Sequence, residues 1–270
     1  MSSTLPIHTA GVPAGGSQSD PALEVRGLVK RFHGGPPVLR DINLSVRFGE
    51  CVAVLGANGS GKSTLMRCIV RLVDPDAGQV WLGGADLTSM NGRRLRAARR
   101  QAAMVFQQIH LVRRRSAVDN VCFGALGRLP SHRSFSRTVF PSDVRLLAMG
   151  ALGRVGLADK AAQRADTLSG GQAQRVAIAR ALCQHASVIL ADEPVASLDP
   201  RAAETVMALL RDIAHIDRLA VVSVLHQPDL ARRYADRLVG MRSGVIVFDR
   251  RPGEVSDDDI AGLYEGEDGD

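Results

Sequence analysis

A short apolar run that leads into a glycine-rich loop and then into a helix most constrains how this chain can fold. The stretch from residue 50 to residue 64 reads ECVAVLGANGSGKST. Val52 to Leu55 predicts a short buried strand, and Leu65, Met66, Ile69 and Val70 recur at helical spacing. The loop between them matches the pattern G-x-x-x-x-G-K-[ST]. Strand, loop and helix in this order predict an α/β protein with a phosphate-binding P-loop.

The P-loop residues have distinct expected roles. Glycines allow backbone N–H groups to converge on phosphate oxygens, and the helix N-terminus adds a positive dipole. We expect Lys62 to reach the β- and γ-phosphates of a nucleotide and Ser63 to ligate Mg²⁺. The residues expected around the nucleotide here are Gly56, Asn58, Gly59, Ser60, Gly61, Lys62, Ser63 and Thr64.

Composition supports a large α/β domain. Of the 270 residues, 45% are hydrophobic and 4% aromatic, with Ala, Val and Leu abundant, which suits buried parallel strands covered by helices. No apolar run approaches the ~20 residues that span a bilayer. The polar segment 1–21 is expected to be a disordered tail, and residues 256–270 an acidic tail. Four dispersed cysteines are interpreted as buried, free thiols in a reducing cytoplasm.

Two carboxylates follow a second buried strand. Val188 to Ala191 is an apolar run that ends in Asp192 and Glu193. After a P-loop, such a pair predicts that Asp192 holds Mg²⁺ and that Glu193 orients or deprotonates the water that attacks the γ-phosphate.

A second candidate phosphate site lies far along the chain, in the segment LSGGQ of residues 168–172. Ser169 can cap the helix that follows it, while Gly170 and Gly171 allow close backbone approach to an anion, next to Gln172. Taken alone, these residues fit a plain capped helix equally well.

The P-loop, LSGGQ and LADEP in this order resemble the nucleotide-binding subunits of ABC transporters, over nearly all of residues 23–255. The resemblance implies a head-to-tail homodimer in the ATP-bound state, in which LSGGQ of one subunit binds the γ-phosphate held by the P-loop of the other. By the same resemblance Phe32 stacks on adenine, although a core phenylalanine is the alternative. Gln107 contacts Mg²⁺, Asp199 in ASLDP lies in the loop that crosses to the partner's site, and His226 contacts the γ-phosphate.

The resemblance also implies an architecture and a location. We expect a RecA-like, mainly parallel core (residues 22–85 and 166–255), an antiparallel β portion and an inserted helical subdomain (residues 86–165). The implied partners are transmembrane permease subunits and, through them, a substrate-binding protein outside the membrane. The chain would then be a peripheral protein on the cytoplasmic face of the inner membrane.

Charge is unevenly distributed along the chain. Residues 86–165 hold fifteen Arg or Lys against four Asp or Glu, within an overall formal charge of +6. A solvated helical face is one explanation of this excess. Attraction to an anionic membrane or an acidic partner is the functional alternative. Arg113, Arg114 and Arg115 lie in this part of the chain.

Some segments resemble one group of importers more closely. SVLHQPDLARRYADRLVGMRSGVIVFD, VRRRSAVDNVCFGALGR and LPSHRSFSRTVFPSD are similar to the ATPase subunits of phosphonate importers, although Ala173 and Arg250 depart from the usual pattern. We therefore expect an ATPase that drives uptake of phosphonates or related organophosphorus anions. An importer ATPase for another solute is the alternative. A soluble ABC ATPase acting on nucleic acid or ribosomes is a further one, but the chain shows neither a repeat nor sustained heptads, and no nucleic acid partner is expected.

Overall fold

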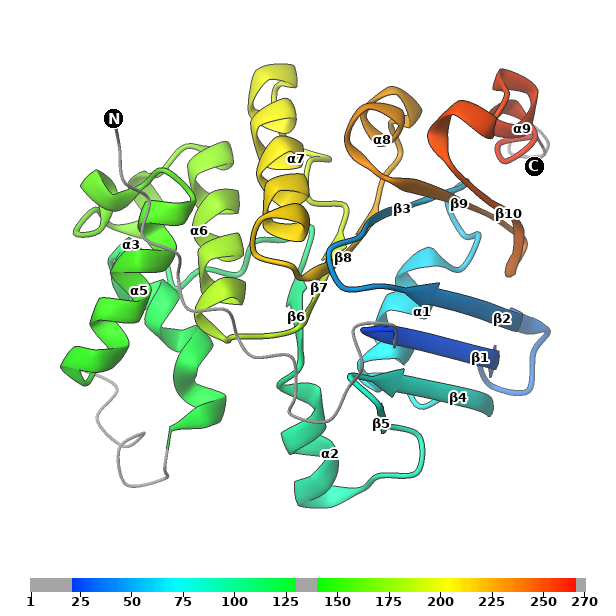
Figure 1. The fold of residues 1–270 in the computed structure, drawn as a ribbon, viewed down its shortest axis with the longest axis horizontal. Helices are drawn as coiled ribbons and strands as arrows, with labels where there is room; N and C mark the ends of the chain where they lie inside the picture. The colour runs from blue at the N-terminus through cyan, green and yellow to red at the C-terminus, as the bar shows by residue number, and fades with distance from the viewer. Residues whose placement is uncertain (1–20, 130–139, 266–270) are drawn as a thin grey trace.

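A computed structural model describes residues 21–129 and 140–265 of the chain. The predicted N-terminal tail, most of the segment LPSHRSFSRTVFPSD and the last residues of the acidic tail lie outside the described residues. Two sheets organise the rest, and Figure 1 shows them as separate layers.

The larger sheet has six strands, and all of its neighbouring pairs are parallel except the one at the β10 edge. All residues of β3, β7 and β8, three of its four inner strands, are buried, as expected for parallel strands covered on both faces. The predicted strands at Val52 to Leu55 and Val188 to Ala191 are confirmed within one residue. The order across the sheet is β10 (Val245–Arg250), β9 (Arg237–Arg242), β3 (Cys51–Leu55), β8 (Ala220–Val224), β7 (Val188–Asp192) and β6 (Ala102–Val105).

The smaller sheet is antiparallel throughout, which confirms the expected antiparallel β portion. It contains β2 (Pro37–Val46), β1 (Leu23–Arg31), β4 (Ala77–Leu82) and β5 (Ala85–Asp86), in that order. Helix α1 (Lys62–Ile69) shares one apolar cluster with residues of both sheets, and Leu65, Met66 and Ile69 are fully buried in it. The predicted burial of this helix is therefore confirmed.

A second apolar cluster covers the other face of the six-stranded sheet. Helix α7 (Pro200–His215) places Val206, Met207, Leu210 and Ile213 in this cluster, at helical spacing. Figure 1 shows α6 and α7 side by side over the sheet, with α3 and α5 grouped beyond α6. The helices here are α3 (Ala117–Cys122), α5 (Ser142–Arg154), α6 (Gly170–Cys183), α7 and α8 (Pro228–Tyr234).

Residues 86–165 are not wholly helical. Helix α2 (Gly92–Arg99) leads into β6, whose residues Ala102 to Val105 pair with Val188 to Ala191 of β7 and extend the large sheet. Four apolar residues are too few to reveal their period, so the sequence alone does not separate this strand from the surrounding helices. Short 3₁₀ turns lie at η1 (Phe123–Arg128), η2 (Ala158–Lys160) and η3 (Ala165–Thr167).

The beginning of the expected acidic tail is folded. After η4 (Pro252–Glu254), Ser256 caps helix α9 (Asp257–Ala261), and Leu263 is buried in the second apolar cluster. The ion pairs Arg232–Asp257 and Arg250–Asp259 hold this helix against α8 and β10. The burial of Leu263 and the pairing with Arg232 and Arg250 depend on residues distant in the sequence. The acidic composition of this segment does not predict them.

In the part of the chain that the structure covers, no helix has the length and apolarity needed to cross a membrane.

Candidate active site

The carboxyl ends of four neighbouring strands carry most of the predicted site residues. The P-loop follows β3, Asp192 ends β7, His226 lies two residues after β8, and Gln107 lies two residues after β6. Because parallel strands end at one edge of the sheet, this order gathers residues that are far apart in sequence.

The P-loop wraps around the ammonium group of Lys62. Lys62 is 5% exposed, and its Nζ donates to the carbonyls of Gly56 and Ala57, each at 2.7 Å. The hydroxyl of Ser60 lies 3.4 Å from the same Nζ. This is a preorganised positive charge at the N-terminus of α1, where anions are favoured.

A cavity of about 190 Å³ lies over this loop. Residues of the P-loop line it together with Glu193 and with Val38, which the sequence did not indicate. Val38 is a β2 residue with no chemical signature, so only the packing of β2 beside the loop reveals it. The lining residues are Val38, Asn58, Gly59, Ser60, Gly61, Lys62, Ser63, Thr64 and Glu193.

Ser63 and Asp192 lie together at the edge of this cavity. The Ser63 hydroxyl donates to Oδ1 of Asp192 over 3.1 Å, and Asp192 is 8% exposed. Burial raises the pKa of the Asp192 carboxyl, and the charge of Glu193 adds to this, while the hydrogen bond from Ser63 opposes it. A hydroxyl and a carboxylate in contact form a hard-oxygen donor pair next to a phosphate site.

Glu193 and His226 form a second pair. His226 Nε2 lies 2.7 Å from Oε1 of Glu193, and both side chains remain partly exposed, 32% for His226 and 18% for Glu193. Glu193 has a φ of 52°, in the left-handed region, as the chain leaves β7. The pair therefore joins the ends of β7 and β8 at the border of the cavity.

The LSGGQ segment and Asp199 lie together in a different group. Ser169 and Gln172 form a reciprocal capping box at the start of α6, with Ser169 Oγ accepting from the Gln172 N–H over 3.3 Å. Asp199 caps α7, accepting from the Ala202 N–H over 2.9 Å. The two helix starts touch, because a Cβ added at Gly171 would lie 3.0 Å from the Cβ of Ala202. None of these described residues lines the cavity over the P-loop.

Phe32 and Gln107 are both at the surface. Phe32 is 42% exposed, so its interpretation as a core phenylalanine is wrong, and the Lys30 ammonium lies 5.3 Å from its ring centroid. Gln107 is exposed in the turn after β6. Neither residue is among those that line the cavity.

A second cavity, of about 340 Å³, collects basic side chains from α2, η1 and α6. Burial lowers the pKa of Arg128 and of Arg180, which donate to backbone carbonyls of Cys183 and of residues 109 and 110. Arg99 and Arg100 likewise donate to backbone carbonyls. The lining combines these positive charges with apolar surface: Arg96, Arg99, Arg100, Arg128 and Arg180, with Met104, Phe123, Gly124, Gly127, Ala181 and Gln184.

The fold and the loop define the class of protein. A parallel sheet with a P-loop at the carboxyl end of one strand, and an acidic pair at the end of another, is a P-loop nucleotide-binding fold. A protein-family model described as "ABC transporter" matches residues 39–196. The chain therefore belongs to the ABC transporter family, and it is an ATP-binding ATPase of that family.

Curated relatives align with almost the whole chain. The "Phosphonates import ATP-binding protein PhnC 1" of Ruegeria sp. (strain TM1040) is 44% identical over 244 residues, 90% of this chain and 95% of that protein. The "Phosphonates import ATP-binding protein PhnC" of Frankia casuarinae is 50% identical over 234 residues, which cover 87% of this chain and 92% of the relative.

Solved structures share the fold. The cbiO1 protein of Clostridium perfringens, described as part of an ABC transporter complex, has a TM-score of 0.78 at 28% identity and covers 89% of this chain and 93% of that one. The cassette MJ0796, solved as a dimer bound to ADP and Pi, has a TM-score of 0.72 at 31% identity. The match covers 85% of this chain and 98% of MJ0796.

Proposed function

We propose that this chain is the ATPase subunit of an importer for phosphonates or related organophosphorus anions. The assignment of ATP hydrolysis is supported by one observation. At one end of the parallel sheet, the structure brings together Lys62, the Ser63–Asp192 pair and the Glu193–His226 pair. The names of relatives that align along most of the chain support the substrate class.

The residues present suit a magnesium ion beside the nucleotide. Ser63 and Asp192 supply oxygen donors in contact, and the raised pKa of the buried Asp192 is what a neighbouring cation would offset. When bound there, Mg²⁺ would offset negative charge on the phosphates. We also assign Gln107 to this ion, although its side chain lies in the exposed turn after β6.

The chain's own groups then divide the work of phosphoryl transfer. Lys62 and the backbone N–H groups at the start of α1 bind the phosphates and stabilise the charge that develops on them. Glu193 orients the attacking water and accepts its proton, while His226, in contact with Glu193, positions that carboxylate and faces the γ-phosphate. Phe32, exposed directly after β1, stacks on the adenine.

The separation of the site into two groups supports a head-to-tail homodimer. Ser169 to Gln172 and Asp199 gather at the touching starts of α6 and α7 and take no part in lining the P-loop cavity. We propose that these residues complete the ATP site of the second subunit. A dimer is also how the similar cassette MJ0796 was solved.

The inserted segment 86–165 separates the core segments 22–85 and 166–255 in the sequence. We propose that permease subunits bind beside this inserted segment, at the cytoplasmic face of the inner membrane. The arginine-lined cavity between α2, η1 and α6 supports this, because its positive charges favour an acidic partner surface. A substrate-binding protein outside the membrane delivers the solute to the permease.

The test is the ATPase rate of the protein reconstituted with its permease and binding protein, with and without a simple alkylphosphonate. We expect the alkylphosphonate to stimulate hydrolysis. Stimulation by a different solute, with no response to phosphonates, would retain the transporter and reject the substrate class. Binding of RNA or DNA instead of the permease would reject both.

A further inference from the structure

Three residues outside the P-loop pack against its backbone: Val38 of β2, Met241 of β9 and Gly244 of the β9–β10 turn. We name them the P-loop brace. Gly244 lies in the two-residue turn between β9 and β10, with Ser243 before it, and both have positive φ values, 80° and 49°. A two-residue turn with positive φ at both positions is the type I′ hairpin turn, which favours glycine.

Hydrogen bonds tie this turn to the P-loop on one side and to β2 on the other. The Gly244 N–H donates to the carbonyl of Ser60 over 3.0 Å, and the Gly244 carbonyl accepts from the Arg40 N–H over 2.8 Å. The bond to Ser60 fixes a carbonyl in the middle of the loop, two residues before Lys62. It therefore constrains the loop without approaching the cavity itself, whose lining does not include Gly244.

The contacts around the turn leave no space for an additional carbon atom. A Cβ added at Gly244 would lie 2.3 Å from the Val38 carbonyl oxygen, and one at Gly56 would lie 2.1 Å from the Met241 carbonyl oxygen. Val38 O would also lie 2.9 Å from a Cβ at Gly61. Backbone of β2 and of β9 thus presses on both ends of the P-loop, at Gly61 and at Gly56.

We propose that Gly244 is a positioning residue for ATP, which acts by fixing the P-loop backbone through Ser60 and Val38. The donors that surround a phosphate must be held in place before the ligand arrives, because small displacements weaken each hydrogen bond. The hairpin turn supplies this support from a segment with no nucleotide-binding motif. The proposal rests on the assignment of the P-loop as the ATP site.

The chain contains a matched control. Gly84 lies at the same position of another two-residue hairpin turn, between β4 and β5, with the same φ of 80°, preceded by Gly83 at 54°. A Cβ added at Gly84 would meet nothing within 4 Å. Gly84→Ala therefore introduces the backbone strain alone, whereas Gly244→Ala introduces the same strain together with displacement of the brace.

The experiment compares Mg²⁺-ATP dissociation constants and melting temperatures of the unaltered chain, Gly244→Ala, Gly84→Ala and Lys62→Ala. We expect Gly244→Ala to raise the Kd at least about tenfold, the effect of losing about one hydrogen bond to a charged group. We expect Gly84→Ala to leave the Kd within about twofold while lowering the melting temperature. Equal Kd values for the two glycine variants would overturn the proposal. Absence of ATP binding by the unaltered chain would instead overturn the ATP site, and the proposal with it.

A second measurement uses the unaltered protein and does not depend on whether Gly244→Ala folds. If the turn and the P-loop open together, saturating ATP slows hydrogen exchange of the Gly244 N–H more than that of the Gly83 N–H, which donates to the Ala22 carbonyl over 2.9 Å. Equal slowing at the two glycines would overturn the coupling.

Discussion

His226 Nε2 lies 2.7 Å from the Oε1 atom of Glu193, although the two residues leave different strands of the sheet. Asp192, adjacent to Glu193, is engaged separately by the Ser63 hydroxyl. The two carboxylates that follow one strand therefore have different partners. This division supports different roles for them, one beside the phosphates and one beside the attacking water.

Glu193→Gln is expected to preserve ATP binding and to lower hydrolysis by about 10²- to 10⁴-fold, because it removes the proton acceptor while keeping the shape of the side chain. Phosphate release and ATP binding by the same preparation measure this. Glu204→Gln is the control, since Glu204 is an exposed residue of α7 paired with Arg233. Loss of ATP binding as complete as in Lys62→Ala would contradict the role given to Glu193.

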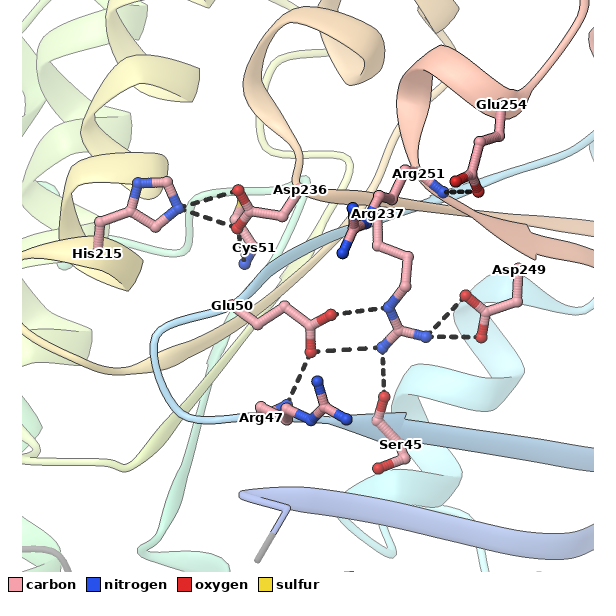
Figure 2. A network of polar contacts seen from close by, with 10 residues as sticks. All are labelled: Ser45, Arg47, Glu50, Cys51, His215, Asp236, Arg237, Asp249, Arg251 and Glu254. Atoms are coloured by element: carbon pink, nitrogen blue, oxygen red, sulfur yellow. Dashed lines mark hydrogen bonds and ion pairs between the residues drawn. The ribbon is translucent and has the colours of Figure 1, made fainter. Parts of the chain in front are cut away.

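His226→Ala is expected to lower hydrolysis on its own and to add little to Glu193→Gln, because residues that act as a unit are not additive. A double-mutant cycle on the rate of hydrolysis tests this. His215→Ala serves as the control, because His215 pairs with Asp236 at the opposite end of the strands, as Figure 2 shows. Fully additive effects of the His226 and Glu193 changes would mean that their contact has no part in the reaction.

Ser169→Arg is expected to leave ATP binding within about twofold and to reduce hydrolysis by about 10²-fold, because it removes a donor that we assign to the second subunit's phosphates. The change also removes a helix cap, which costs about 1 kcal/mol. Ser256→Arg controls for that loss, since Ser256 forms the same capping box at the start of α9. Sedimentation with ATP reports dimer formation, and a dimer as abundant as that of Ser256→Arg would argue against the proposed interface.

Arg237 organises a polar network at the amino ends of β3 and β9 (Figure 2). Its guanidinium donates to Glu50 at 2.8 Å and to both oxygens of Asp249 at 2.7 and 2.6 Å, and it also contacts the Ser45 carbonyl. Arg237→Ala leaves two partly buried carboxylates without this partner, and we expect a loss of about 2 kcal/mol or more in the free energy of unfolding. Arg233→Ala breaks an exposed pair and should cost about 1 kcal/mol or less. Urea denaturation of both variants gives the comparison, and equal losses would show that the network stabilises the fold no more than an exposed ion pair does.

The sequence was sufficient for features carried by local pattern. Strand β3, the burial of α1, the Asp192–Glu193 pair after β7 and the cap at Ser169 all depend on residues that are close in the chain. The position of Val38 beside the P-loop and the support from Gly244 depend on β2 and the β9–β10 turn reaching the same loop. Neither residue has a chemistry that marks it, so their contribution exists only in the packed fold. Strand β6 and helix α9 were not predicted from the sequence for the same reason. Pairing with β7 stabilises β6, and burial of Leu263 stabilises the segment that contains α9.

The reactivity of the four cysteines links the core to the nucleotide site. All four cysteines are free and buried, and burial raises their pKa, to about 12 for Cys51 and Cys122 and to about 11 for Cys68 and Cys183. Because a raised pKa keeps the thiol protonated, raising the pH from 7 to 9 should not produce the thiolate that reacts with iodoacetamide in the native protein.

Labelling then requires opening of the structure, and denaturant should accelerate it where alkaline pH does not. Since Cys51 begins β3 and Cys68 lies in α1, on either side of the P-loop, ATP should slow their labelling. At a concentration 100 times its Kd, ATP stabilises the native state by about 2.7 kcal/mol and should reduce the rate about 100-fold. Mass spectrometry of alkylated peptides measures each thiol, with labelling of all four in guanidinium as the control. If native Cys51 is labelled rapidly and ATP does not change the rate, the strand before the P-loop opens independently of the nucleotide site.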